Sequence, residues 1–277
     1  SRVTVIKEDG NKSTISPIHL NKHIDYNLPE GNHAERELSL AMPLGMDISN
    51  DGKTLYIAAF SSSKIGVFDT QSLENNSFTP SLSNQIPLSG GGPTNVIINE
   101  KHNRLYALTR FDNSVSTVDL SAKSEIQHIA MFNPEPVHIT EGRPFLYDAT
   151  NTSGHGDASC GSCHLFGDTD GLAWDLGDPG AELKESPNTY VEEDFGEKRQ
   201  SFHPLKGPMT TQSFRGLTGN GPMHWRGDRT GINKTADESL ESAAFKEFNP
   251  AFVGLLGLEN ELSVDDIQKF TDFALSI

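Results

Sequence analysis

An internal repeat in the first half of the chain limits the fold more than any other feature of the sequence. Residues 43–70 and residues 93–120 align without a gap, at an offset of 50 positions. The matched positions include Pro43 with Pro93, Leu55-Tyr56 with Leu105-Tyr106, and Asp69 with Asp119. Each copy holds three short apolar stretches separated by turn residues, which is typical of antiparallel strands joined in sequence. The repeat therefore predicts two similar antiparallel sheets, one after the other.

Turn residues stand at corresponding places in the two copies. Asn50-Asp51-Gly52 and Ser61 to Ser63 separate the apolar stretches of the first copy. Lys101 to Asn103 and Asp112-Asn113 hold the matching places in the second copy. Asn, Asp and Gly favour tight hairpin turns because they tolerate positive φ angles.

The Leu-Tyr pair and the Asn-Ser-Val-Ser-Thr-Val-Asp run within residues 105–119 resemble YVTN-type β-propellers. The resemblance covers roughly residues 40–147 and implies that each copy is one propeller blade. A truncated third copy is expected at Pro136 to Tyr147, and a leftover strand at Val3 to Ile6. Since a closed propeller needs at least about four blades, the missing blades have been removed or lie on a further chain or subunit. Two similar meanders within a β-sandwich are the alternative.

The composition changes where the repeat pattern stops. The remaining chain is rich in Gly, Asp and Pro, and has two helical stretches near its end. One helix is expected over Glu238 to Phe248, and Ser263 with Asp266 forms a capping box that opens a second. The expected fold class is therefore a mixed multidomain protein. It consists of a partial β-propeller over residues 1–147, followed by a mainly α-helical, loop-rich domain over residues 148–277.

The only two cysteines stand in the sequence Cys160-Gly161-Ser162-Cys163-His164. This is the C-x-x-C-H pattern of haem c attachment. Two thiols must reach the two vinyl groups of one porphyrin edge, and the histidine that follows is then carried under the iron as its proximal ligand. A thioredoxin-like dithiol lacks the preceding βαβ pattern, and a zinc site lacks a second pair of ligands. The motif predicts one covalent haem c, with the ring N–H of His164 donating to a backbone carbonyl.

Residues 153–164 resemble the haem-binding start of c-type cytochromes. The resemblance implies that residues 148–277 form a cytochrome c domain. It also implies a bacterial protein of the periplasm or the extracellular space, because haem c is attached outside the cytoplasm. Both cysteines are consumed by the haem, so the lack of disulfides is compatible with an oxidising compartment.

The sequence leaves the sixth iron ligand open. Met209 and Met223 both follow the motif at separations that occur in c-type cytochromes, and methionine raises the potential of the haem. The candidate histidines are His224, His203 and His155, and any of them gives a lower-potential bis-histidine haem. An iron without a sixth protein ligand indicates peroxide chemistry.

Residues 207–217 and 221–228 resemble a region of the bacterial dihaem cytochrome c peroxidases. Phe214-Arg215-Gly216-Leu217 stands where that family has Leu-Arg-Asn-Val, and Pro222 to Gly227 stands where it has a Pro-to-Gly turn. Those enzymes carry an axial methionine after the turn, whereas residues 236–254 contain none. The resemblance implies a peroxidase-type enzyme as an alternative, and this departure counts against its ligand scheme.

Further residues of the second half are candidates for contacts with the haem. Arg215, Arg226 and Arg229 suit the haem propionates, because a partly buried carboxylate needs a charge-assisted bond. Solvated surface arginines are the alternative. Trp174 and Trp225 are the only tryptophans, and both are expected to wall the haem.

Four aspartates follow the motif closely, namely Asp168, Asp170, Asp175 and Asp178. Oxygen ligands at this density are able to hold calcium, although their spacing is not that of an EF-hand loop. Solvated acidic turns are the alternative.

The net charge of the chain limits the kinds of partner that we expect it to bind. Lys and Arg number 22 against 38 Asp and Glu, which gives a net charge of −16. Such a field repels nucleic acid and anionic membranes, and no apolar run approaches the roughly 18 residues that span a bilayer. The acidic surface favours a basic redox partner, whose docking salt would weaken.

Three functions fit these observations. Electron transfer through one haem c, with the propeller segment as a docking platform, is the leading interpretation. A peroxidase-type haem enzyme is the second, so whether the protein is an enzyme stays open. In the third, the propeller binds a ligand and the haem acts as a sensor. The resemblance also implies more blades and a further C-x-x-C-H in proteins of this architecture.

Overall fold

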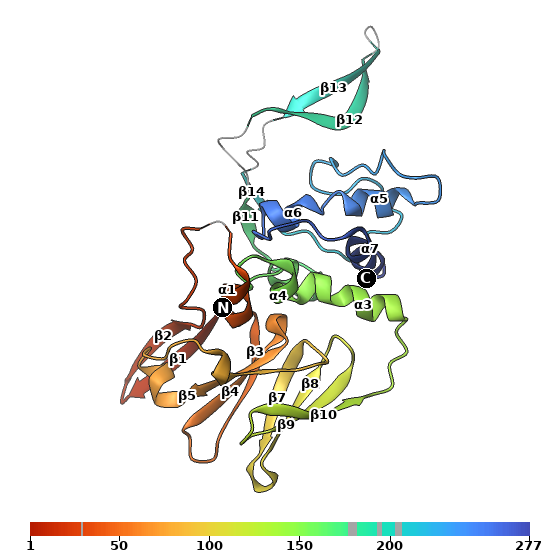
Figure 1. Ribbon diagram of the computed structural model, residues 1–277. Helices are drawn as coiled ribbons and strands as arrows, with labels where there is room; N and C mark the ends of the chain where they lie inside the picture. The colour runs from red at the N-terminus through yellow and green to blue at the C-terminus, as the bar shows by residue number, and fades with distance from the viewer. Residues whose placement is uncertain (29, 177–181, 193–195, 203–206) are drawn as a thin grey trace.

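The computed structural model describes residues 1–28, 30–176, 182–192, 196–202 and 207–277. Two antiparallel sheets lie at one end of the molecule and the longer helices lie beyond their edge (Figure 1). The coarse expectation of a mixed α and β protein with antiparallel sheets is confirmed.

Each copy of the repeat forms a four-stranded antiparallel sheet. The first sheet is ordered β3 (Pro43–Ile48), β4 (Thr54–Ala59), β5 (Lys64–Asp69) and β6 (Gln85–Pro87). The second sheet consists of β7 (Pro93–Asn99), β8 (Arg104–Thr109), β9 (Ser114–Asp119) and β10 (Ser124–Ala130), hydrogen-bonded in chain order. The two predicted meanders are confirmed, and each has a fourth strand that the repeat did not predict. The fourth strands lie beyond the aligned residues, so the repeat carried no signal for them.

The turns between these strands have the backbone that their residues favour. Gly52, Ser63, Asn103 and Asn113 all have positive φ, at 71°, 53°, 54° and 58°. Each of these positions ends a predicted turn, where Gly and Asn adopt the left-handed conformation at low cost. The predicted turns are therefore confirmed.

The two sheets pack face to face. Their shared core joins one set of buried side chains from the first sheet to another from the second: Tyr56, Ala58, Ile65, Val67 and Ile86 against Val96, Leu105, Ala107 and Val118. Residues at equal places in the two copies also touch, because Asn50 donates its backbone N–H and its side-chain amide to the Glu100 carboxylate, at 2.6 and 2.7 Å. The sheets thus stack face to face, with equivalent positions of the two copies in contact.

A hairpin of β1 (Arg2–Asp9) and β2 (Lys12–His19) covers the opposite face of the first sheet. Its Val3 and Ile18 are buried against Ile57 and Phe68. The strand expected at Val3 to Ile6 is therefore confirmed. Two short helices lie in this region, α1 (His33–Leu38) and α2 (Thr70–Glu74).

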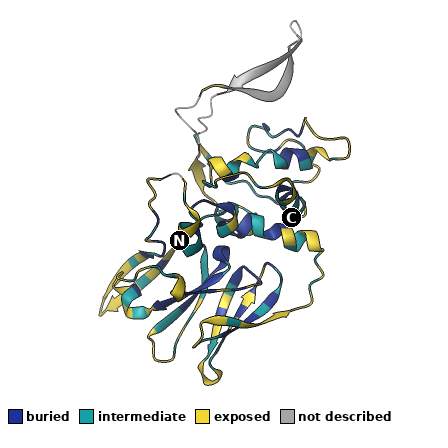
Figure 2. Cartoon of the chain, in the orientation of Figure 1, coloured by how far each residue is buried: buried dark blue, intermediate teal, exposed yellow. Residues whose placement is uncertain are grey.

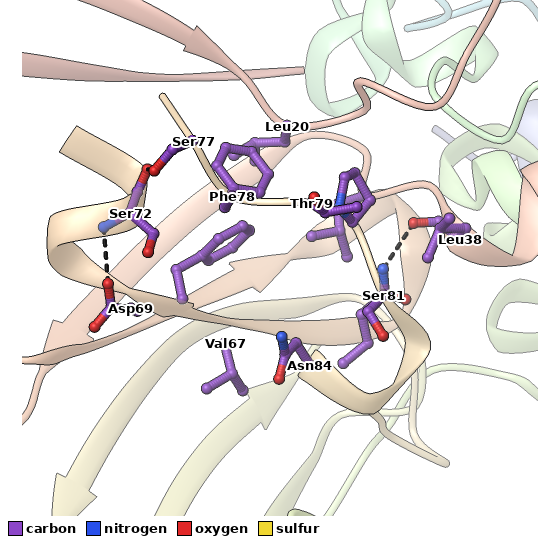
Figure 3. A pocket seen from close by; sticks show the side chains of 14 residues that line it. Leu20, Leu38, Val67, Asp69, Ser72, Ser77, Phe78, Thr79, Ser81 and Asn84 are labelled. Carbon is purple, nitrogen blue, oxygen red and sulfur yellow. Dashed lines mark hydrogen bonds between the residues drawn. The ribbon is translucent and has the colours of Figure 1, made fainter. Parts of the chain in front are cut away.

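A cavity of about 310 Å³ lies beside this covered face (Figure 3). Leu20, Leu40 and Phe68 line it together with Phe78, and the N-cap bond from Ser72 to Asp69 stands at one side of it. Phe68 and Phe78 meet edge to face, with ring centroids 5.2 Å apart.

The expected third copy is wrong, because residues 137–147 form a helix, α3 (Val137–Tyr147). The residues of α3 that are buried are Gly142, Arg143, Leu146 and Tyr147, at spacings of one helical turn, so the segment buries a helical face and not a strand face. The described residues contain two blade-like sheets and no closed propeller.

The second half combines helices with two-stranded ribbons. The further helices are α4 (Ala149–Thr152), α5 (Leu240–Lys246), α6 (Pro250–Gly254) and α7 (Val264–Ala274). The ribbons pair β11 (Ala173–Asp175) with β14 (Pro208–Thr210), and β12 (Lys184–Glu192) with β13 (Gly196–Phe202). Both predicted helices are present, and Ser263 caps α7 by accepting the N–H of Asp266 at 3.1 Å. The four ribbon strands were not predicted, so this half is less helical than expected.

An aromatic cluster joins the sheets to the helices. Phe60 and Phe111 lie just beyond β4 and β8, and both contact Tyr147 of α3, with centroid distances of 5.5 and 6.3 Å. Arg143 donates to the carbonyl of Phe111 at 2.8 Å. Figure 2 shows buried residues where the sheet ends meet α3. In the part of the chain that the structure describes, no helix has the length and apolar character to cross a membrane.

Candidate functional site

The C-x-x-C-H motif follows α3 and α4 in the sequence. It begins with a single 3₁₀ turn, Cys160–Ser162. The turn is closed by the N–H of His164, which donates to the carbonyl of Cys160 at 2.9 Å. Gly161 packs flat on Tyr147, since a Cβ atom there would lie 2.6 Å from the ring. Glycine at this position therefore lets the motif approach α3 closely.

The two thiols are unpaired with each other and have raised pKa values. Burial raises the pKa of Cys160 to about 12, and it raises the pKa of Cys163 as well. Cys160 also packs against the main hydrophobic cluster. A redox-active dithiol needs a lowered thiol pKa, so this environment counts against thioredoxin-like chemistry.

His164 is held in one orientation by two contacts. Its Nδ1 donates to the carbonyl of Gln212 at 2.6 Å. Its ring stacks on Phe214 with centroids 4.3 Å apart and an interplanar angle of 11°. Burial lowers the pKa of the histidine, which favours the neutral ring. With the proton on Nδ1, the lone pair is on Nε2, the form in which histidine binds a metal.

Residues 208–214, which we call the strap, run alongside the motif and the loop after it. The strap pairs with β11 through Met209 opposite Trp174. The N–H of Thr211 donates to Leu172 at 3.2 Å, and that of Phe214 donates to Gly167 at 3.0 Å. On its other side, Trp225 donates its indole N–H to the carbonyl of Thr210 at 2.8 Å. The strap thus connects the motif to both tryptophans.

Large apolar side chains are exposed along the strap and the adjoining loop. The exposed fractions are 56% for Phe166, 53% for Leu172, 41% for Trp174 and 53% for Trp225. Exposed apolar side chains of this size are candidates for contact with an apolar partner or ligand. Two thiols, an oriented imidazole and this apolar surface are the features that a covalently attached porphyrin requires, so the residues present fit haem c.

The candidates for the sixth ligand occupy different surroundings. Met223 is 7% exposed and belongs to the same hydrophobic cluster as Phe214. Met209 lies in β14. His224 has a φ of 73°, and its Nδ1 lies 2.6 Å from the carboxylate of Asp228. No contact here selects among the three, so the sixth ligand stays a prediction.

His155, another candidate for the sixth ligand, has a protein partner at each ring nitrogen. Its Nδ1 pairs with the Glu35 carboxylate, and its Nε2 lies 3.0 Å from the carbonyl of Leu28. Both ring nitrogens are thus occupied by a segment from the start of the chain. Tyr26, from the same early segment, also donates its hydroxyl to Asp157 at 2.7 Å. His203 lies outside the described residues.

The expected propionate partners lie near the strap and already have protein contacts. Arg215 is exposed and lies 3.3 Å from Asp168. Arg229 lies 3.2 Å from Asp228, with its guanidinium over the ring of Phe248. Arg226 lies in the turn between them. Pairing of these arginines with a haem stays a prediction.

The acidic residues after the motif cap turns of the backbone. Asp170 accepts the N–H of Leu172 at 2.9 Å and the indole N–H of Trp174 at 2.8 Å. No group of three or more His, Cys, Asp or Glu side chains converges as a metal site among the residues that the structure describes. Asp178 lies outside those residues. Asp170 thus stabilises a turn, and calcium binding by these aspartates stays a prediction.

Sequence reasoning missed Gln212, Glu35 and Tyr26. Gln212 acts through its backbone carbonyl, which any residue would supply, so no side-chain pattern could indicate it. Glu35 and Tyr26 contact residues more than a hundred positions away. Spacing along the chain carries no information about such contacts.

No protein-family model and no curated protein sequence matches the chain. Among solved structures, the hydrazine synthase of Kuenenia stuttgartiensis is similar over 32% of this chain, with 26% sequence identity and a TM-score of 0.27. The chain spans only 25% of the length of that protein chain. A likeness of this extent carries no argument about fold or function.

Proposed function

We propose that the protein is an electron-transfer cytochrome that carries one covalent haem c on Cys160, Cys163 and His164. The observation that carries the proposal is the hydrogen bond from His164 Nδ1 to the Gln212 carbonyl, at 2.6 Å, within a C-x-x-C-H motif. A histidine that binds a metal commonly donates its other ring N–H to such a carbonyl, which fixes the tautomer and raises the basicity of the ligand. When bound, haem c supplies a reversible one-electron couple.

The residues around the motif have separate tasks in this proposal. The two cysteines hold the porphyrin edge through thioether bonds. Phe214 fixes the plane of the His164 ring by stacking on it. Trp174 and Trp225 cover the group and exclude water, and burial of this kind tunes a redox potential.

The sixth ligand sets the range of the potential. Met209 or Met223 would raise it, and His224 would lower it. The Asp228 carboxylate that orients His224 at 2.6 Å would make that histidine a more basic ligand.

The proposed setting is the periplasm or the extracellular space of a bacterium, because haem c is attached there. The net charge of −16 favours a basic redox partner. The two blade-like sheets contact Tyr147 through Phe60 and Phe111, and Tyr147 packs against Gly161 of the motif. We propose that they serve as the platform on which a partner docks.

Visible spectroscopy of the purified chain tests the proposal. We expect low-spin haem c bands in the dithionite-reduced protein, and a pyridine haemochrome typical of two thioether bonds. The Cys160→Ala, Cys163→Ala double variant is the matched control and should lose covalent haem. A protein without haem bands would contradict the proposal. A high-spin ferric spectrum would favour the peroxidase-type enzyme instead.

A further inference from the structure

The connection between the last two strands is much longer in the first copy of the repeat than in the second. Residues 70–84 join β5 to β6, whereas residues 120–123 join β9 to β10. The second copy shows that a short turn is enough to complete such a sheet. The longer connection forms α2 and then a loop over residues 75–84, which we call the cover loop. The sheet does not need the cover loop for its own pairing, so we looked for another role for it.

The cover loop encloses one side of the 310 Å³ cavity beside the first sheet (Figure 3). Residues 77–81 and Asn84 of the loop line this cavity. Lys22 holds the loop in place, because its ammonium donates to the carbonyls of Asn76 and Phe78 at 2.8 and 3.1 Å. The same ammonium lies 3.8 Å from the centroid of the Phe78 ring. The cavity is therefore bounded by a loop that the rest of the protein fixes, and it exists before any ligand arrives.

The cavity has an apolar inner wall and a polar mouth. The inner wall is formed by buried side chains, chiefly Leu20, Leu40, Val67 and Phe68. The mouth is lined by exposed residues, namely Asp69, Ser77, Thr79 and Asn84. Asp69 is the one charged residue in the described lining. A charge inside the cavity would lose its water without a charged partner, and the carboxylate at the mouth repels anions, so the cavity suits a neutral molecule.

Gln85, the first residue of β6, places an unpaired acceptor in this lining. The residue is only 8% exposed, and its Nε2 donates to the carbonyl of Leu38 at 2.7 Å. This bond identifies the nitrogen end of the amide, so the other end is the oxygen Oε1, which accepts hydrogen bonds. Among the described residues, no group donates to Oε1. Because an unpaired buried carbonyl is unfavourable, a ligand that donates an O–H to it would bind at this point.

We propose that the cavity binds a small neutral aromatic alcohol, whose O–H donates to Gln85 Oε1 and whose ring packs against Phe78 and the inner wall. Its volume is near the lower end of the range for ligand sites in proteins. It exceeds the roughly 150 Å³ of an apolar cavity that holds benzene, so one substituted ring fits. Phe68 and Phe78 already meet edge to face, and a further ring suits the same packing. This inference does not depend on haem attachment.

The probe for the test is 4-methylphenol, added to the ¹⁵N-labelled full chain and followed by NMR. We expect saturable shifts of the Gln85 side-chain amide and of the backbone N–H groups of residues 77–79, with a Kd of about 0.1–1 mM. The comparison probe is 4-methylanisole, which has the same ring but no O–H. It should bind about three- to tenfold more weakly, because it cannot donate to Oε1.

The variant Gln85→Met removes the acceptor and should weaken binding of 4-methylphenol by about the same three- to tenfold. The matched control is Gln127→Met, at an exposed residue of β10 outside the cavity, which should bind as the wild type does. If Gln85→Met does not fold, the two probes on the wild-type chain still decide the question. No saturable shift up to about 10 mM 4-methylphenol, ten times the weakest Kd expected, would show that the cavity holds only water and would overturn the proposal. Equal binding of the two probes, or shifts confined to residues outside the cavity, would also overturn it.

Discussion

The Nδ1 atom of His164 lies 2.6 Å from the carbonyl oxygen of Gln212, a residue 48 positions further along the chain. Because a carbonyl only accepts hydrogen bonds, the ring proton is on Nδ1 and the lone pair is on Nε2. In the proposed haem site, the C-x-x-C-H motif supplies His164 as the proximal ligand. The contact with the strap explains how its ring is held in a form that binds a metal.

The stacking of Phe214 on His164 leads to a stability prediction. Phe214 also contacts Phe245 and Phe270, with centroid distances of 5.9 and 6.4 Å. Phe214→Ala should therefore lower the free energy of unfolding by about 2–4 kcal/mol, measured by urea denaturation. Phe132 is 88% exposed, so Phe132→Ala is the control and should change it by less than about 0.5 kcal/mol. Similar effects of the two variants would contradict the position assigned to Phe214.

The close approach of Gly161 to Tyr147 predicts a cost for a single methyl group. Gly161→Ala should destabilise the protein by about 1–3 kcal/mol in thermal or urea unfolding, because its Cβ would lie 2.6 Å from the tyrosine ring. Gly254 has no atom within 4 Å of such a Cβ, so Gly254→Ala is the matched control. This control should be neutral or stabilising by up to about 1 kcal/mol. A Gly161→Ala protein as stable as the wild type would rule out the close packing.

The pair of His155 and Glu35 predicts a pH-dependent stability. Burial lowers the pKa of His155, but hydrogen bonds to Glu35 and Leu28 and the Glu35 charge outweigh it, so the pKa is raised. A raised histidine pKa stabilises the fold below the unfolded value of about 6.5, and this contribution is lost as the pH rises through the folded-state pKa. His155→Gln should therefore cost more stability at about pH 5 than at about pH 9. An equal cost at both pH values would show that the charge of His155 adds nothing.

The proposed haem makes the choice of sixth ligand measurable. Met209→Leu and Met223→Leu conserve side-chain volume, so each should lower stability by less than about 1.5 kcal/mol. We expect one of the two variants to lose the methionine-to-iron band of the oxidised protein and the other to keep it. If both keep the band, neither methionine is the ligand. If the wild type has no such band and is low-spin, His224→Ala becomes the variant to measure.

The two sheets were predictable because their signals are local. Turn residues such as Gly52 and Asn103 recur at fixed places, and the apolar stretches between them fit short strands. The third copy was wrongly expected because Pro136 to Ile139 resembles the start of the repeat and Leu146-Tyr147 resembles its Leu-Tyr pair. Arg143 and Leu146 are buried on one helical face, which fits a helix and not a strand. This burial comes from the packing of α3 against α7, which the local sequence does not reveal.

The candidate site was predictable only as far as its motif. Cys160, Cys163 and His164 lie within five residues of one another, so the haem c prediction follows from the sequence alone, and it stays a prediction. The hydrogen bond between Glu35 and His155 joins residues 120 positions apart. This contact occupies Nδ1 of a histidine that the sequence left open as an iron ligand, and only the folded chain brings these two residues together.

The most direct test of the central claim is the mass of the peptide that contains the C-x-x-C-H motif. The chain should be expressed with a haem c attachment system, digested, and separated under denaturing conditions that remove non-covalent haem. We predict that the peptide with Cys160 and Cys163 has gained the mass of one haem, and that it absorbs in the visible. A peptide with two unmodified thiols, recovered from that same preparation, would contradict the account.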